Sequence, residues 1–169
     1  MTTDAPEAAP TAGPSIPVPA SASTGPISHA IFRVTRLHKM YAGQLLRRVG
    51  LHPAQELVMM HLWDRGPQRQ GELARLLDSD AATMTRTVQR LENAGFVRRR
   101  PCETDGRVTI VEPTAASLAL RAGVENAWAE LEAGSTQGLS EVEQKQLLAL
   151  LSRVESSLSA ATGSSGIAG

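Results

Sequence analysis

The sequence of 169 residues contains one cysteine, Cys102, and no long apolar run. A single cysteine excludes an intramolecular disulfide framework and agrees with a reducing cytoplasm, where we expect the protein to reside. No stretch approaches the ~20 apolar residues that cross a bilayer, so we expect no membrane partner. Residues 1–26 also lack the basic and apolar regions of a signal peptide.

Motifs for catalysis and metal binding are missing as well. The chain has no nucleophile elbow, phosphate-binding loop or metal-hydrolase motif, so we predict that it is not an enzyme and needs no cofactor. The four histidines are His29, His38, His52 and His61. No two of them lie three or four residues apart, so no helix offers two imidazoles to one ion. We therefore predict no metal site.

The charge of the chain is balanced in number but not in distribution. Lysine and arginine together equal aspartate and glutamate at 17 each, yet residues 28–50 hold five basic side chains and no acid. From Glu112 onward, acids outnumber bases. This asymmetry favours a nucleic-acid face and a separate assembly region. The segments 1–26 and 159–169 are rich in Ala, Ser, Thr and Gly, and we expect both to be disordered tails.

Residues 80–93 predict an amphipathic helix with one polar face. Asp80 is suited to the N-cap, and Met84, Val88 and Leu91 recur at positions i, i+4 and i+7 as a buried stripe. At 100° per residue the opposite face carries Ala82, Thr83, Arg86, Gln89 and Arg90. A helix of this kind fits the major groove of B-DNA, where Arg, Gln and Thr address base edges.

A β-hairpin is predicted directly after this helix. Gly95 suits the left-handed C′ position, residues 96–100 and 107–111 predict two strands, and residues 101–106 form a polar turn. Helix followed by hairpin indicates a winged helix-turn-helix. Beyond the capping Asp80, residues 81–107 contain six arginines against three acids, namely Arg86, Arg90, Arg98, Arg99, Arg100 and Arg107 against Glu92, Glu103 and Asp105. Charge alone favours an ordinary solvated surface, and it is the order of helix, hairpin and turn arginine that favours DNA binding.

Helices are predicted on both sides of this core. The first covers residues 27–49; the second begins near Pro53 and ends near Trp63; and a short one covers residues 71–77. Thr114 caps a long helix, residues 134–138 form a loop, and Ser140 to Glu143 match a capping box that opens a last helix with a leucine stripe. The apolar stripes exceed what one small domain covers, which predicts dimerisation.

The segment from Leu73 to Ser117 resembles the DNA-binding core of the MarR family of bacterial transcriptional regulators. The matching pieces are Leu73-Ala74, Asp80 to Glu92, Gly95-Phe96-Val97 and the wing Asp105-Gly106-Arg107. The chain departs from the family pattern at three positions, with Ala82 for Ser, Pro113 for Leu and Ser117 for Gly.

The resemblance implies a mainly α fold with a small β-hairpin wing. It places a dimerisation helix at 27–50, a winged helix-turn-helix domain at 51–112 and further dimerisation helices at 113–158. The implied function is a ligand-responsive repressor that binds a palindromic operator as a homodimer, in the cytoplasm with the nucleoid. The effector would be a small molecule held between the dimer helices and the winged lobe, where His38, Tyr41 and Arg47 are candidates. We assign no ligand-binding residues.

The residues that match the family motif carry expected contacts to DNA. Thr83, Arg86 and Gln89 are expected near base edges, while Thr85 and Arg90 are divided between bases and phosphates. Arg107 resembles the family's minor-groove arginine. Asp105 is expected to hold its guanidinium by a charge-assisted hydrogen bond.

Two other functions stay open at this point. One is a winged-helix module for protein–protein contact, whose arginines bind an acidic partner. The other is a metal- or thiol-responsive sensor of the same fold, in which Arg98 to Arg100 depress the pKa of Cys102. An inert wing cysteine is the interpretation favoured here, and the choice between repression and activation is left open.

Overall fold

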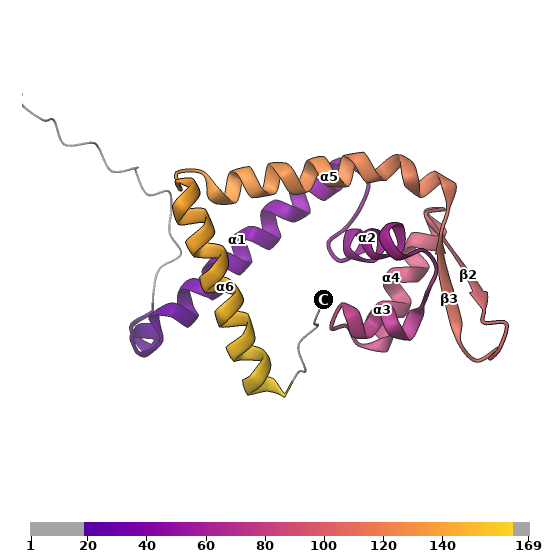
Figure 1. Cartoon of the computed structure of the whole chain (residues 1–169), viewed down its shortest axis with the longest axis horizontal. Helices are drawn as coiled ribbons and strands as arrows, with labels where there is room; N and C mark the ends of the chain where they lie inside the picture. The colour runs from indigo at the N-terminus through magenta and orange to yellow at the C-terminus, as the bar shows by residue number, and fades with distance from the viewer. Residues whose placement is uncertain (1–18, 164–169) are drawn as a thin grey trace, which may run out of the picture. The chain divides into compact units, whose positions relative to one another are not determined.

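The computed structural model describes residues 19–163 and is mainly helical with one small antiparallel sheet (Figure 1). The elements in chain order are η1 (Ala20–Thr24), α1 (Pro26–Arg48), α2 (Gln55–Arg65), β1 (Gln68–Arg69), α3 (Gln70–Leu76), α4 (Ala81–Asn93), β2 (Val97–Pro101), β3 (Thr109–Pro113), α5 (Ala115–Thr136) and α6 (Glu141–Thr162). The chain divides into two units, residues 1–37 and 38–169. The predicted fold class is confirmed. No helix within 19–163 is long and apolar enough to cross a membrane.

Three helices begin at the caps that the sequence predicts. Asp80 accepts a hydrogen bond from the Thr83 backbone N–H at 2.8 Å, and Thr114 caps α5 through the N–H of Ser117. Ser140 and Glu143 form both halves of a capping box at the start of α6. Each cap supplies an acceptor to an N–H group that has no partner within the helix.

The sheet has the strand order β1-β3-β2, and β3 pairs antiparallel with both neighbours. β2 and β3 form the predicted hairpin, with Val97 opposite Pro113 and Pro101 opposite Thr109. β3 begins two residues later than predicted, because the turn is closed by the N–H of Val108 donating to the Asp105 carbonyl at 2.9 Å. β1 was not predicted, since two residues give no periodic pattern.

The core of the second unit lies among α2, α3, α4 and the hairpin, and α5 and the end of α1 complete it. The fully or nearly fully buried apolar residues include Leu45, Leu51, Met59, Leu62, Leu73, Met84, Val88, Leu91, Val111, Val124 and Leu131. Trp63 of α2 donates its indole N–H to the Ser117 hydroxyl at 3.1 Å, which ties α2 to the first turn of α5. Ser117, a departure from the family pattern, is thus buried and satisfied.

The start of α2 differs from the prediction. The helix begins at Gln55, not at Pro53, and Ala54 before it adopts a left-handed conformation with φ of 74°. The Gln55 side chain accepts a hydrogen bond from the His52 N–H at 2.8 Å. This contact closes a turn over Pro53, and the turn takes the place of the expected first helical residues.

Residues 134–136 are helical, so the predicted loop at 134–138 is wrong in its first half. A Cβ at Gly134 would lie 2.7 Å from Cε1 of Tyr41, so glycine allows α1 and α5 to approach closely here. Gly123 plays the same part against Val49, whose Cγ1 would lie 2.8 Å away. The true loop covers residues 137–139, where Gly138 has φ of 90°.

Both predicted tails are partly ordered. α6 continues to Thr162 instead of ending at residue 158, and Gly163 ends it with φ of 66°. The prediction of disorder for 159–169 is therefore wrong as far as Thr162. Residues 20–24 of the segment 1–26 form a 3₁₀ turn. The remaining parts of both predictions, at 1–18 and 164–169, lie outside the described residues.

Candidate nucleic-acid interface

α4 presents one buried and one exposed face. Met84, Val88 and Leu91 are buried against the core at 2 %, 0 % and 0 % exposure. Arg86 and Gln89 project to solvent from the opposite side. The packing therefore fixes which face of α4 is free to meet a partner.

Thr83 is half-buried, and its hydroxyl is engaged in the cap of α4. It donates to Asp80 Oδ2 at 2.7 Å and accepts from the Arg86 guanidinium at 3.1 Å. The Thr83 hydroxyl and then its backbone N–H lower the pKa of Asp80 from its ordinary value. Thr83 thus orients the Arg86 side chain along the helix surface.

Thr85 joins α4 to α3. Its hydroxyl donates to the Ala81 carbonyl at 2.7 Å and accepts from the Gln70 side-chain amide at 3.0 Å. Gln70 was not among the predicted site residues, because a lone glutamine before a short helix carries no recognisable signal. The contact makes Thr85 a link between the two helices of the helix-turn-helix.

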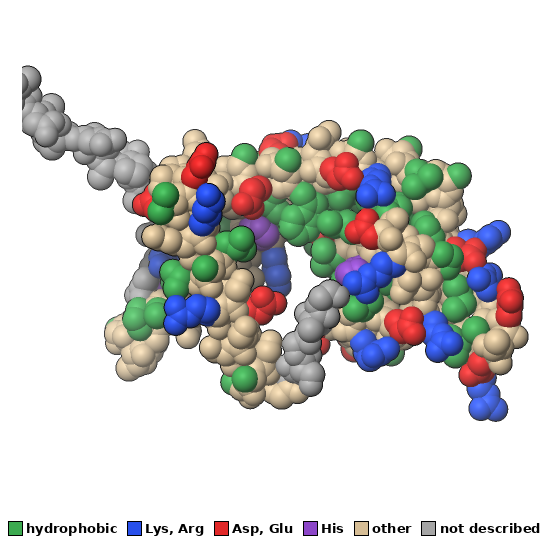
Figure 2. All heavy atoms as spheres, viewed as in Figure 1, with side chains coloured by type: hydrophobic (Ala, Val, Ile, Leu, Met, Phe, Trp, Pro, Cys, Tyr) green, Lys and Arg blue, Asp and Glu red, His purple; other side chains and the backbone are tan. Residues whose placement is uncertain are grey.

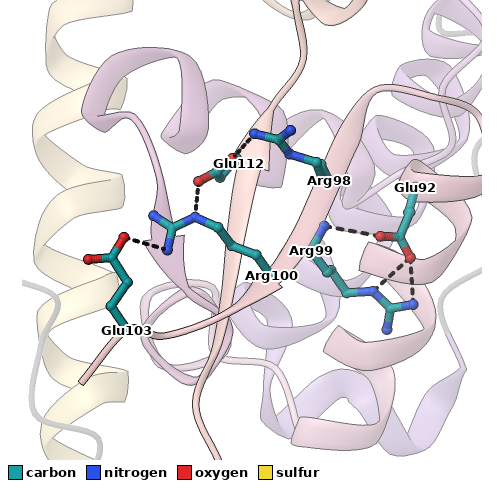
Figure 3. Close-up of polar contacts among 6 residues, drawn as sticks. All are labelled: Glu92, Arg98, Arg99, Arg100, Glu103 and Glu112. Carbon is teal, nitrogen blue, oxygen red and sulfur yellow. Dashed lines mark hydrogen bonds and ion pairs between the residues drawn. The ribbon is translucent and has the colours of Figure 1, made fainter. Parts of the chain in front are cut away.

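Two arginines of β2 are bound to an acid of the opposite strand (Figure 3). Arg98 donates to Glu112 Oε2 at 2.7 Å, and Arg100 donates to Glu112 Oε1. The guanidinium of Arg100, and then that of Arg98, lowers the pKa of the Glu112 carboxyl. These arginines therefore stabilise the hairpin, and their two charges are offset by Glu112 together with Glu103, whose carboxylate lies 3.9 Å from Arg100.

Arg99 faces the other side of β2 and binds α4 (Figure 3). Its Nε donates to Glu92 Oε2 at 2.8 Å, and its backbone N–H donates to Glu92 Oε1 at 3.0 Å. The Arg99 side chain, and next its backbone N–H, holds the pKa of Glu92 below its ordinary value. This pair locks the hairpin to the C-terminal part of α4.

Not all of the six arginines counted in the sequence carry unpaired charge in the structure. Figure 2 shows basic side chains interleaved with acidic ones around the hairpin and α3. Arg86, Arg90 and Arg107 make no ion pair with any acid in residues 19–163, whereas Arg98, Arg99 and Arg100 do. The free positive charge of the predicted segment therefore comes from α4 and the hairpin turn.

The predicted contact between Asp105 and the Arg107 guanidinium is wrong. Asp105 Oδ1 accepts a hydrogen bond from the backbone N–H of Arg107 at 3.0 Å. This short turn directs the carboxylate to the backbone and leaves the exposed Arg107 side chain without an acid partner in the described chain. Asp105 thus shapes the turn and does not hold the guanidinium.

A second basic surface lies between the start of α3 and the turn end of the hairpin. A hollow of about 480 Å³ is lined there by Arg69, Arg75 and Arg107 together with Gln70, Gly71, Glu72, Val108 and Thr109. Arg69 lies 4.0 Å from the Glu72 carboxylate, while Arg75 is exposed. The sequence reasoning missed Arg69 and Arg75, although a charge count over residues 65–75 would have found both.

Cys102 lies at the end of β2 and has a lowered pKa, whose main cause differs from the predicted one. The Thr104 hydroxyl, 3.3 Å from the Cys102 sulfur, is the main cause, followed by the backbone at Thr104 and Asp105. Positive charge contributes less: Arg69 lowers the pKa of the thiol, and of the three predicted arginines Arg100 also interacts with the thiolate. Residues 19–163 contain no cluster of three potential metal ligands.

A cavity of about 410 Å³ lies among the end of α1, the start of α2 and the middle of α5. Its lining is mostly apolar and comprises His38, Lys39, Ala42, Leu45, Leu46, Pro53, Ala54, Glu56, Leu57, Ala127, Trp128 and Leu131. His38 lines it as suggested, whereas Tyr41 and Arg47 do not. Glu56 is only 6 % exposed, and burial raises the pKa of its carboxyl above the ordinary value.

Known proteins resemble this chain in the segment that contains α4 and the hairpin. The MarR family model matches residues 51–109. The HTH-type transcriptional regulator MgrA of Staphylococcus aureus is 27% identical over 119 residues, which are 70% of this chain and 80% of that protein. The uncharacterized HTH-type transcriptional regulator YwoH of Bacillus subtilis is 39% identical over 75 residues, 44% of this chain and 55% of its own.

Solved structures agree in fold. A probable transcriptional regulator from Pseudomonas aeruginosa is 28% identical with a TM-score of 0.70, covering 78% of this chain and 98% of its own. A mutant of MarR from E. coli, complexed with operator DNA, is 23% identical with a TM-score of 0.74. The match covers 81% of this chain and 99% of the MarR chain.

Proposed function

We propose that this chain, which belongs to the MarR family of transcriptional regulators, reads a specific operator with α4 and releases it in response to a small molecule. The regulators of this family are not enzymes. The observation that carries the proposal is the exposed polar face of α4, where Arg86 and Gln89 project opposite a fully buried stripe. Operator DNA is the named partner of one structural neighbour, the MarR mutant.

We assign the base contacts to α4 in the major groove. Arg86 and Gln89 offer bidentate hydrogen bonds, each worth about 1–3 kcal/mol of discrimination between bases. Thr83 is proposed to present its side chain at the same edge while it orients Arg86. The contacts of Thr85 and Arg90 are proposed to be divided between base edges and phosphate groups.

The hairpin is proposed as a wing that follows the adjacent minor groove. Arg107 has a free guanidinium in the turn, and such side chains are favoured where the minor groove narrows. Asp105 supports the wing by holding the turn through the Arg107 N–H. Arg69 and Arg75 add phosphate contacts beside it, which fix register without reading sequence.

A homodimer and a palindromic operator complete this proposal. α6 has no buried residue, although it carries an exposed apolar row at Leu147, Leu150, Leu151 and Leu158, with Val142 and Leu148 exposed on its other sides. α1 likewise leaves Ile27, Phe32, Val34, Leu37 and Met40 exposed. A second copy that covers such surfaces would present two recognition helices about one or two DNA turns apart, which calls for half-sites of two-fold symmetry. In this arrangement residues 27–50 and 113–158 form the dimer, and residues 51–112 bind DNA.

The cavity among α1, α2 and α5 is proposed as the effector site. Its volume lies within the ~300–1,000 Å³ typical of ligand pockets, and its wall is mostly apolar. The cavity includes residues of α2, which packs on α4. A ligand there can change the relative placement of the two DNA-binding lobes, and we expect this change to relieve repression by occlusion at the nucleoid.

Fluorescence anisotropy with the DNA upstream of the protein's own gene, against a scrambled duplex across a salt series, tests the proposal. We expect the native duplex to bind at least about a thousandfold tighter, and Arg86→Ala to remove most of this difference. Glu132→Gln, an exposed change on α5, is the matched control and should bind as the wild type does. Failure of both duplexes to bind in low salt would reject DNA reading and favour the protein-contact module.

A further inference from the structure

Glu56 is out of place in the wall of the cavity among α1, α2 and α5. In residues 19–163 it is the one ionisable side chain that is fully buried, at 6 % exposure. Its Oε2 atom has no hydrogen-bond partner. A buried polar atom without a partner costs free energy, so such atoms in folded proteins call for a specific explanation.

The side chains around Glu56 do not supply a partner, and only the backbone N–H groups of Glu56 itself and of Ala54 lie near enough to lower the pKa of its carboxyl. The α5 side of the cavity is Ala127, Trp128 and Leu131, none of which titrates. α1 contributes His38 and Lys39, and both of these side chains are exposed. The cavity thus combines an apolar body, a buried acid on the α2 side and basic groups only where solvent reaches them.

We propose that Glu56 is the polar anchor of this cavity, and that the cavity selects a lipophilic amine. An ammonium group donates a charge-assisted hydrogen bond to Oε2, while the apolar part of the ligand fills the space against Leu45, Trp128 and Leu131. This inference rests on the proposed role of the cavity as the effector site and gives that effector a chemical class. An organic anion of the same shape would bring its charge to a buried carboxyl and is disfavoured.

A structural role for Glu56 predicts a different outcome. An acidic side chain in the first turn of a helix interacts favourably with the helix dipole, and Glu56 is the second residue of α2. That role needs no ligand, so it would make the stability of the protein sensitive to Glu56 and leave ligand preference unchanged.

Calorimetric titration of the free full-length protein distinguishes the two roles. The probes share one apolar group and differ in the head group: 4-phenylbutylamine, 4-phenylbutanol and 4-phenylbutanoate. We expect the wild type to bind the amine at least about tenfold tighter than the alcohol, and the anion weakest. Glu56→Gln should lose about tenfold toward the amine and change little toward the alcohol, while Glu132→Gln keeps the wild-type order.

The ligand order of the wild type tests the inference even where Glu56→Gln is poorly folded. Equal binding of amine and alcohol, tighter binding of the anion, or an unchanged amine affinity in a folded Glu56→Gln variant would each overturn it. DNA binding is measured separately by anisotropy. If the protein prefers the amine but does not bind DNA, the proposed function is rejected and this inference stands. If it binds DNA without preferring the amine, this inference is rejected and the proposed function stands.

Discussion

At the scale of single residues, arginines that look alike in the sequence have different surroundings. Arg98 and Arg100 share the carboxylate of Glu112, and Arg99 is held by Glu92. Arg86 and Arg107 are exposed and have no acid partner in the part of the chain that the structure describes. Only the second group can contribute its full charge to a nucleic acid.

Arg107→Ala is therefore expected to weaken operator binding about tenfold, and to reduce the slope of log affinity against log salt by about 2 in a homodimer, because each protomer loses one positive charge at the DNA. Arg99→Ala is the matched control in the same hairpin, and it should change the slope much less because Glu92 alone holds that side chain against α4. Anisotropy titrations at several salt concentrations measure both. Equal slopes for the two variants would contradict the assignment of the wing.

The sequence predicted the exposed face of α4 at this scale, because helical periodicity alone separates Arg86, Gln89 and Arg90 from the buried stripe. It did not predict the partners of the β2 arginines. Glu112 lies 14 residues from Arg98 in the chain, and only the strand register brings the two opposite each other. For the same reason the role of Glu56 was out of reach, since its burial depends on α1 and α5.

At the scale of elements, the Glu92–Arg99 pair is the connection between α4 and the hairpin. The pKa of Glu92 is lowered from its ordinary value of 4.5, so the pair stabilises the fold above that pH and loses its contribution as pH falls below it. Glu92→Gln should cost about 1 kcal/mol at pH 7, because the pair is partly exposed.

That cost should shrink as the pH falls below the ordinary value of 4.5 and Glu92 of the wild type becomes protonated as well. Urea unfolding of wild type and Glu92→Gln at pH 7 and pH 3.5 measures the two differences. Glu132→Gln serves as the control, since Glu132 is exposed and makes no ion pair among the described residues. A cost of equal size at both pH values would show that the charge of Glu92 is not what matters.

Local signals predicted the element boundaries wherever a cap marks them. Asp80, Gly95, Thr114 and Ser140 all lie where the sequence put them, because a cap acts within three or four residues. The continuation of α5 through Gly134 was missed. A glycine there looks like a loop residue, and only the packing of Tyr41 against it shows that it serves a helix crossing.

At the scale of the whole molecule, α6 is the helix that the described chain leaves uncovered. Leu150 and Leu151 are 54 % and 52 % exposed, although they belong to an apolar row on a helix with a complete capping box. A soluble monomer gains nothing from this surface, and a second copy would bury it. We expect Leu150→Asp with Leu151→Asp to convert a dimer into a monomer at micromolar concentration.

Light scattering after size exclusion measures this mass, and circular dichroism checks that the helices remain folded. Ser156→Asp adds a charge to the same helix outside the leucine row and should leave the dimer intact. A wild type that is monomeric at the same concentration would show that α6 is covered in some other way. The winged domain itself would keep its fold in either case, because its core is complete within one chain.

The connections around α4 have a consequence for the DNA. Gln70 ties α3 to Thr85, and Glu92 ties the hairpin to the other end of the helix, so we expect α3, α4 and the hairpin to keep their relative placement on DNA. In a dimer, two such units would hold the two recognition helices at a fixed spacing, since neither unit bends to meet a displaced half-site. An inserted base pair at the centre of the operator rotates and shifts one half-site relative to the other. We therefore expect the protein to bind such an operator as weakly as one with substituted bases.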